Sequence, residues 1–390
     1  MTPPAGTLPA QQGYAASPAA GQPAAVPFAQ ASHHGLEQGP TFTVTPGAAQ
    51  QTFGPFPLPA TGYLRRVIIE LTTTTNGVAG TGAGDYPFNI FALLRLTDTN
   101  GAPIFELSGY NTLLADTYGG YAGAPDPRTD PDFSSSVTTP SIEPYIPLEI
   151  DPTGMGSPAN LSASSAYRLT CVVDTSGNIW SAAPTTIPTF TVQVWCDYWT
   201  LPNPTDMQNR PQAIAPPYAG TIQLWSQQPN IAVNAGANRI ALNRMGNLLR
   251  TVLCVFRSSG ARSDAVIGDP LTQRWDDINL QVVDRKTLRK IMREYTNDLT
   301  ARDTGVYLFG LYNYGIERNV GGTSVASWLP TVTATRYEVN TPAGSGGGGT
   351  LDFVINDVSV AATAPEQRAA VGGMGVGFHP PVAPVIPGAT

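Results

Sequence analysis

Charged residues are scarce in this chain of 390 residues. Asp, Glu, Lys and Arg make up 13% of it, about half of the roughly 25% usual in globular proteins. The net charge is −7, and Glu37 is the only charged side chain before Arg65. A segment with so few cations cannot neutralise nucleic-acid phosphates, so we expect no direct binding of nucleic acid. A neutral surface suits a protein whose flanks are covered by copies of itself.

Histidine is also rare, and its positions argue against an enzyme. The three histidines are His33, His34 and His379. All three lie in segments that we expect to be terminal arms, whereas an acyl-transfer or hydrolytic triad needs its base inside a fold. The sequence contains no Gly-x-Ser-x-Gly elbow, no Walker loop and no His-Glu-x-x-His pattern. We therefore predict no enzymatic activity and no cofactor.

The few cysteines and the absence of long apolar runs exclude further classes. Cysteine occurs only at Cys171, Cys196 and Cys254. Residues so far apart and partly within strand-like runs are expected to be buried hydrophobes rather than a disulfide framework or a zinc site. The first 30 residues lack a charged region followed by an apolar one, and no stretch reaches 18 apolar residues. Neither a secretion signal nor a membrane span is predicted.

Three short motifs have a chemical interpretation beside a simpler one. Gly80–Gly84 is glycine-rich, but it leads into Asp85-Tyr86-Pro87 rather than a helix, which favours a hairpin loop over a phosphate cradle. Asp126, Asp130 and Asp132 form a weak calcium candidate, because they lack the Gly and distal Glu of an EF-hand. Asp276-Asp277 is either half of a glycosidase carboxylate pair or a solvated turn, and we favour the turn.

Glycine and proline are abundant and favour an all-β fold. The chain has 40 Gly and 37 Pro, with 42% hydrophobic residues, so turns are frequent and real cores are feasible. Thr41–Thr45 alternates, and so does the segment from Phe190 to Thr200. There Phe190, Val192, Val194, Cys196 and Tyr198 are predicted to share the core face, opposite Thr191, Gln193, Trp195, Asp197 and Trp199. This period of two predicts a strand with one buried face.

One pattern occurs twice. Gly62–Leu71 and Gly246–Val255 share the pattern Gly-x-Leu-x-Arg-x-aliphatic-aliphatic, at an offset of 246 − 62 = 184 residues. An offset of domain size predicts a β-domain duplicated in tandem.

The predicted domain boundaries follow from composition. We expect a flexible N-terminal arm at 1–40, a first β-unit at 41–203, a Pro-rich linker at 204–220, a second β-unit at 221–360 and a flexible C-terminal tail at 361–390. Ala115–Ser141 and Gly344–Gly349 are predicted loops.

A single amphipathic helix is predicted in the second unit, from Asp284 to Thr300. Its apolar residues recur at helical spacing, Asp284 is placed to cap its start, and the opposite face is basic. The apolar positions are Leu288, Ile291, Met292, Tyr295 and Leu299. The basic positions are Arg285, Lys286, Arg289, Lys290 and Arg293. We favour a helix docked on the end of a barrel, with a basic helix for nucleic acid or membrane as the alternative.

This layout resembles the double jelly-roll major capsid proteins of tectivirus-like, membrane-containing double-stranded DNA bacteriophages, a group related in fold to adenovirus hexon. The local likeness lies in Lys286-Thr287, the basic run through Arg293, Thr296 and Asp298, and Gly305-Val306-Tyr307. Gly246–Phe256 is similar to an early strand of that family's second barrel. The chain departs from the family in two respects. Prolines would interrupt a long helical N-terminal arm, and the first unit shows no obvious helix.

The resemblance implies two tandem eight-stranded jelly-roll barrels, with one amphipathic helix in the second. It also implies a structural role, in which homotrimers form pseudo-hexagonal capsomers that tile an icosahedral virion shell assembled in the host bacterial cytoplasm. The implied partners are the chain itself, penton and minor capsid proteins, and an internal lipid membrane. The alternatives are a trimeric phage fibre or receptor-binding β-protein, and a secreted carbohydrate-active enzyme.

Overall fold

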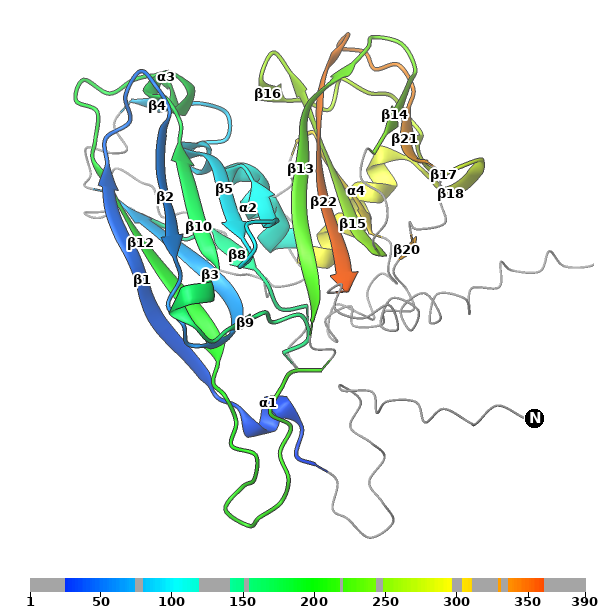
Figure 1. Cartoon of the computed structure of the whole chain (residues 1–390). Coiled ribbons are helices and arrows are strands. Elements are labelled where there is room, and N and C mark those ends of the chain that lie inside the picture. The colour runs from blue at the N-terminus through cyan, green and yellow to red at the C-terminus, as the bar shows by residue number, and fades with distance from the viewer. Residues whose placement is uncertain are drawn as a thin grey trace, which may run out of the picture.

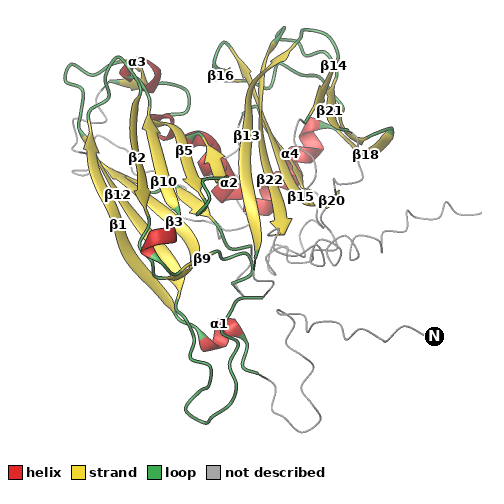
Figure 2. Ribbon diagram, in the orientation of Figure 1, coloured by secondary structure: helices red, strands yellow, loops and turns green. Residues whose placement is uncertain are grey.

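Two β-rich units lie side by side in the computed structural model of the chain (Figure 1). The structure describes residues 25–73, 80–118, 141–150, 154–217, 220–242, 248–296, 304–310, 329–330 and 336–360. Strands dominate both units and helices are short (Figure 2), in line with the predicted all-β class.

The two main sheets of the first unit have eight strand positions among the described residues, one of them divided into three short pieces, and a separate strand pair adds two more. Its strands are β1 (His34–Val44), β2 (Gln51–Pro57), β3 (Gly62–Thr72), β4 (Thr81–Gly82), β5 (Phe91–Thr97), β6 (Pro103–Leu107), β7 (Ser141–Ile142), β8 (Tyr145–Pro147), β9 (Ala159–Asn160), β10 (Arg168–Val173), β11 (Trp180–Ala182) and β12 (Phe190–Trp199). Its helical segments are α1 (Phe28–Ala31), η2 (Phe88–Ile90), α2 (Gly109–Tyr118), η4 (Ala163–Ser165) and α3 (Ser176–Ile179). In the described part of the chain, β4 pairs with β11 in a two-stranded sheet outside the two main sheets.

The second unit repeats this plan with a longer helix. Its strands are β13 (Thr221–Val233), β14 (Asn238–Ala241), β15 (Leu248–Ser258), β16 (Ala261–Arg262), β17 (Leu271–Trp275), β18 (Ile278–Val283), β19 (Val306–Gly310), β20 (Leu329–Pro330), β21 (Tyr337–Thr341) and β22 (Gly349–Val360). Helix α4 (Arg285–Thr296) lies between β18 and β19 in the chain.

The strand orders of the two units correspond. In the first unit one sheet runs β1-β12-β3 with β7, β8 and β9 on the outer side of β3, and the other runs β2-β10-β5-β6. In the second unit the same positions give β13-β22-β15 with β19 and β20, and β14-β21-β17-β18. Each unit therefore has the two antiparallel sheets of a jelly roll, and the predicted pair of jelly rolls is confirmed.

A parallel strand pair joins the units. β6, the edge strand of the first unit, pairs with β13 through Trp225 opposite Phe105 and Ser226 opposite Glu106. The remaining main-sheet pairs are antiparallel, and this junction merges sheets from both units into one sheet of ten strands. The two barrels are thus fixed to each other by backbone hydrogen bonds as well as by side chains.

The strand β15 supplies side chains to two cores. Val252 and Cys254 point into the second unit's core, with Phe309 and Phe353. The alternating residue Leu253 packs into the other cluster, which fills the first unit and continues into the contact between the units. Because successive side chains of a strand point to opposite faces, the middle of β15, Val252–Phe256, is an uninterrupted apolar run. It is covered on both sides.

Helix α2 corrects two expectations. We predicted no helix in the first unit and a loop from Ala115, but α2 spans Gly109–Tyr118 and follows β6 as α4 follows β18. Eight of its ten residues are buried, because it lies between the two units and is covered on both sides (Figure 1). A helix that is buried on nearly all sides, polar residues such as Asn111 and Asp116 included, has no amphipathic period, so pattern analysis misses it.

The N-terminal boundary also differs from the prediction. Strand β1 starts at His34, seven residues before the expected boundary at Thr41, and pairs with β12 from His34 opposite Trp199 onward. The preceding helix α1 buries Phe28. His33 and His34 therefore lie in or beside the folded unit rather than in an arm, while His379 and the tail 361–390 lie outside the described residues.

The alternation predicted for β12 holds only to Cys196. Between Asp197 and Tyr198 the register of β12 with β3 shifts, so that no residue of β12 lies directly opposite Arg65. Asp197 and Trp199 are therefore buried, while Tyr198 is not. The same bulge occurs in the second unit, where the register of β15 with β22 skips Arg250. The structural repeat offset is therefore 250 − 65 = 185 residues, one more than the pattern predicted.

Candidate functional site: the interface between the two units

The weak chemical motifs give no catalytic site among the described residues. Gly82 pairs with Trp180, and the segment from Gly80 forms a strand and turn rather than the start of an α-helix. The main-chain N–H of Asp276 donates to the Arg336 carbonyl at 2.7 Å, and its Oδ1 accepts from the Arg336 N–H at 2.8 Å. Its neighbour Asp277 is exposed. The turn interpretation of Asp276-Asp277 is thus confirmed.

No metal site is found in the part of the chain that the structure describes. That part holds no cluster of three or more His, Cys, Asp or Glu residues suited to a metal. The calcium candidate of Asp126, Asp130 and Asp132 lies outside it. None of the described helices has the length and apolar character to cross a membrane.

The three cysteines are buried and free, as predicted. Burial raises the pKa of the Cys171 and Cys196 thiols to about 12 and raises the pKa of Cys254 as well. Thiols held neutral by an apolar environment are poor nucleophiles and poor metal ligands. Their role is packing.

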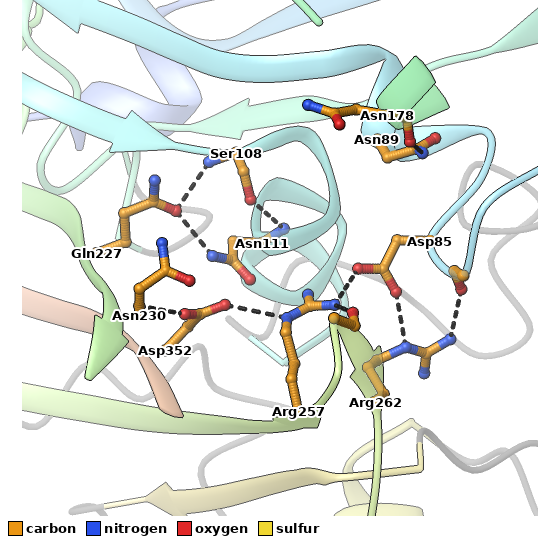
Figure 3. A network of polar contacts seen from close by, with 12 residues as sticks. Asp85, Asn89, Ser108, Asn111, Asn178, Gln227, Asn230, Arg257, Arg262 and Asp352 are labelled. Atoms are coloured by element: carbon orange, nitrogen blue, oxygen red, sulfur yellow. Dashed lines mark hydrogen bonds and ion pairs between the residues drawn. The ribbon is translucent and has the colours of Figure 1, made fainter. Parts of the chain in front are cut away.

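The most elaborate polar arrangement lies where the units meet (Figure 3). Asp85 of the first unit binds two arginines of the second, with 2.6 Å to Arg257 Nη1 and 2.8 Å to Arg262 Nε. Arg257 also pairs with Asp352 at 3.1 Å, and Asp352 accepts the Asn230 N–H at 2.7 Å. Burial opposes the charge of Arg257, but the two carboxylates outweigh it and raise its pKa. The network holds the units together through charges largely removed from water.

The start of α2 is bound by the second unit. Gln227 of β13 accepts hydrogen bonds through Oε1 from the Ser108 N–H at 2.9 Å and from Asn111 Nδ2 at 2.7 Å. Main-chain N–H groups at a helix start have no partner within the helix. Gln227, from the other unit, is the acceptor for the main-chain N–H of Ser108. On the same helix, Tyr110 lies under the guanidinium groups of Arg257 and Arg262.

A second polar cluster forms around the β-bulge of the first unit. Arg65 pairs with Glu149 at 2.6 Å and with Asp197 at 3.0 Å. The Trp199 indole N–H donates to Glu149 at 2.9 Å. Gln223 of β13 donates from Nε2 to the Glu149 carbonyl at 2.9 Å. The Arg65 cluster thus links its own barrel to the second unit.

Helix α4 docks on the second barrel, as predicted. Leu288 and Met292 are buried, and Arg285 pairs with Asp269 at 3.1 Å. Arg289 pairs with Asp264. Two of the five basic residues therefore serve internal contacts, while Lys286 and Lys290 are exposed.

Sequence patterns singled out none of these interface residues. Asp85 stood beside a glycine-rich segment, Arg257 directly followed the segment Gly246–Phe256, and Arg262 belonged to no predicted element. The one available signal was the low overall charge. In a chain with 13% charged residues, a charged side chain beside an apolar strand usually has a specific partner. The partner itself is set by tertiary structure.

Comparison with solved structures shows the same architecture in viral capsid proteins. The STIV MCP, from Sulfolobus Turreted Icosahedral Virus, is 12% identical, with a TM-score of 0.59 over 87% of this chain and 99% of that chain. The major capsid protein P2 of bacteriophage PM2 is 8% identical, with a TM-score of 0.51 over 85% and 99%. VP54 of PBCV-1 is 12% identical, with a TM-score of 0.52 over 84% and 94%.

These likenesses extend over most of this chain and nearly all of the other chains. Because the sequence identities are so low, they show a common fold and nothing further. The chain has the double jelly-roll fold of viral major capsid proteins, as the resemblance seen in the sequence implied. No protein-family model and no curated protein sequence matches the chain.

Proposed function

We propose that this chain is a viral major capsid protein that forms homotrimers. The observation that carries the proposal is the correspondence of strand orders in two barrels joined through β6 and β13. Two like units side by side give three copies six barrels, so a threefold assembly acquires a nearly hexagonal outline. Hexagonal tiles can pave the facets of an icosahedral shell.

The role is structural rather than catalytic. The polar groups brought together at the contact between the units are ion pairs and hydrogen bonds that fix one unit against the other. A capsomer needs this rigidity, because any rotation between its barrels would change the shape of the tile. The proposal extends to the predicted domain division, with terminal segments and loops contributing contacts between tiles.

The proposed setting is a bacteriophage virion assembled in the bacterial cytoplasm. Its support is the sequence resemblance of residues 286–307, together with the fold shared with a bacteriophage protein. Penton and minor capsid proteins and an internal membrane remain predicted partners. Direct nucleic-acid binding is not expected, because the described basic residues of α4 are partly used in internal ion pairs.

The proposal is tested by mass photometry of the purified chain. Three copies of 41.0 kDa give a particle of about 123 kDa. A species of that mass supports the trimer. Particles of 41 kDa at all concentrations accessible to the method would contradict it.

A further inference from the structure

The two strands that join the barrels have equivalents, one in each unit, that lie at the edges of their sheets. Because the strand orders of the units correspond, β18 is the equivalent of β6, and β1 is the equivalent of β13. β6 and β13 are paired with each other within the chain, whereas β18 and β1 are edge strands of their sheets. Unpaired edges are templates for pairing with another chain.

The register of the equivalence is fixed by matching bulges. In the pairing of β5 with β6, Ile104 is skipped, and in the pairing of β17 with β18, Leu280 is skipped. Phe105 and Glu106 therefore correspond to Gln281 and Val282. In the other pair of strands, Trp225 lies opposite Asn356 and Leu36 lies opposite Asp197.

These last partners are themselves equivalent. Asp197 lies opposite Arg66, the residue after the bulged Arg65 of β3, and Asn356 lies opposite Thr251, the residue after the bulged Arg250 of β15. Leu36 thus corresponds to Trp225, Glu37 to Ser226 and Gln38 to Gln227. The proline two residues further on, Pro40 in β1 and Pro229 in β13, keeps the same place.

The equivalent surfaces are apolar and exposed. Trp225 is 1% exposed beneath the first unit, whereas its counterpart Leu36 is 58% exposed. On β18 the side chains of Ile278, Leu280 and Val282 are 69%, 39% and 55% exposed. A strand edge with alternating apolar side chains in water is a liability in a monomer, and a copy of the same chain offers the surface that covers it.

Resting on the proposed trimer, we infer that β18 of one copy pairs in parallel with β1 of the next copy, as β6 pairs with β13 within the chain. In this register Leu36 lies opposite Gln281 of the neighbouring copy, and Glu37 lies opposite Val282. Repeated three times, the contact closes a ring in which internal and intermolecular barrel contacts alternate. The occupant of both edges is thus a second copy of this chain.

The internal contact also predicts what the neighbouring side chains do. Gln227 accepts hydrogen bonds from the start of α2 at Ser108 and Asn111, and the equivalents are Gln38, Asp284 and Thr287. Gln38 is exposed on β1. We therefore expect Gln38 of one copy to accept the Asp284 N–H at the start of α4 in the next.

Charge on the two surfaces is complementary. Lys286 and Lys290, the exposed basic residues of α4, occupy the positions of Tyr110 and Leu114 in α2, which are buried. On the receiving barrel, Glu70 corresponds to Val255, a residue of the internal contact, and Glu37 lies on the exposed edge. Opposite charges at corresponding places favour the correct orientation of approach and suppress wrong pairings.

Disulfide trapping tests the register. In the double variant Glu37→Cys with Val282→Cys, the two Cα atoms come within reach of a disulfide across copies. The three natural cysteines are buried and do not compete. We expect oxidation to give covalent dimers and closed covalent trimers on non-reducing gels. Leu161→Cys combined with Val282→Cys places two exposed positions out of register and serves as the matched control, without cross-linking.

A charge substitution tests the surface itself. We expect Leu36→Asp, which puts a charge where the internal contact buries Trp225, to raise the concentration needed for trimer formation at least 100-fold in mass photometry while circular dichroism stays unchanged. Met207→Asp, at a residue that is 99% exposed in the loop after β12 and belongs to neither edge strand, should leave the trimer intact. If the wild-type chain forms trimers but the cysteine pair is not trapped, or if Leu36→Asp trimerises as the wild type does, this inference is overturned and the proposed function stands. A wild-type chain that stays monomeric overturns both.

Discussion

Removal of the Asp85 carboxylate should loosen the contact between the two barrels. The side chain of Asp85 is 11% exposed and neutralises Arg257 and Arg262 at 2.6 and 2.8 Å. Deleting one partner of a buried ion pair costs about 3–5 kcal/mol, because the remaining charge stays out of water. Arg257 keeps Asp352 as a partner and Arg262 retains some solvent, so we expect about 3 kcal/mol for Asp85→Ala.

Hydrogen exchange followed by mass spectrometry measures this loss where it occurs. A contact weakened by about 3 kcal/mol opens roughly 100-fold more often, so amides of β6, α2 and β13 should lose protection by about that factor. Amides of the β14-β21-β17-β18 sheet lie on the other side of the second barrel and should keep theirs. Asp277→Ala, at a fully exposed carboxylate in a turn, is the matched control and should change nothing.

A double-mutant cycle with Arg262→Ala then separates the pair from its surroundings. We expect a coupling free energy of about 1–2 kcal/mol between Asp85 and Arg262. The reasoning is refuted if Asp85→Ala leaves protection of α2 and β13 unchanged, or if protection falls evenly over both barrels. Either result would mean that the ion pairs do not hold the units together.

Three further substitutions or treatments have defined outcomes. Gly109→Ala should destabilise the protein by about 3 kcal/mol in urea unfolding, because its Cβ would lie 2.0 Å from the Phe88 carbonyl oxygen. Thiol reagents should leave all three cysteines unmodified in the native protein at pH 8 and modify them in urea, because burial raises their pKa; rapid native labelling would contradict their placement. Burial raises the pKa of Asp264, but hydrogen bonds from Gly305, Tyr307 and Arg289 outweigh this and lower it. Its stabilisation is thus fully present above the usual value of 3.8 and declines as pH falls toward and through the lowered native pKa, so Asp264→Asn should lower the urea midpoint more at pH 7 than at pH 2. Equal effects at both pH values would refute this role.

Sequence patterns predicted the elements that have one face accessible to solvent. The alternation in β12 predicted its strand up to Cys196, and the 3.6-residue period predicted α4, where Leu288 and Met292 are buried. Each element has a buried face and a face with residues accessible to solvent, so local sequence alternates between apolar and polar. The repeated pattern likewise predicted two equivalent barrels from a single pair of strands.

The remaining features depend on contacts distant in sequence. Helix α2 has no face exposed to solvent, because the second barrel covers the side that water would otherwise contact. The bulge at Arg65 reverses the alternation of β12 after Cys196, and no local propensity in the sequence indicates such a bulge. The adjacent leucines in Leu248-Leu249 allow two alignments with Leu64, which is why the repeat offset was one residue short.

The ion pairs between the units were beyond prediction for the same reason. Asp85 and Arg262 are 177 residues apart, and their meeting follows from the parallel pairing of β6 with β13. By contrast, the structure identifies β1 and β18 as edge strands, and the internal repeat indicates that strands of another copy would pair with them. Sequence and structure together thus support a specific partner surface that neither provides alone.

Negative-stain electron microscopy of the purified protein tests the central claim most directly. Averaged views down the main axis should show six lobes of similar size around a threefold centre, two from each chain. Elongated rods would favour a fibre protein. Compact two-lobed particles without threefold symmetry would contradict the proposal that this double barrel builds a six-sided tile.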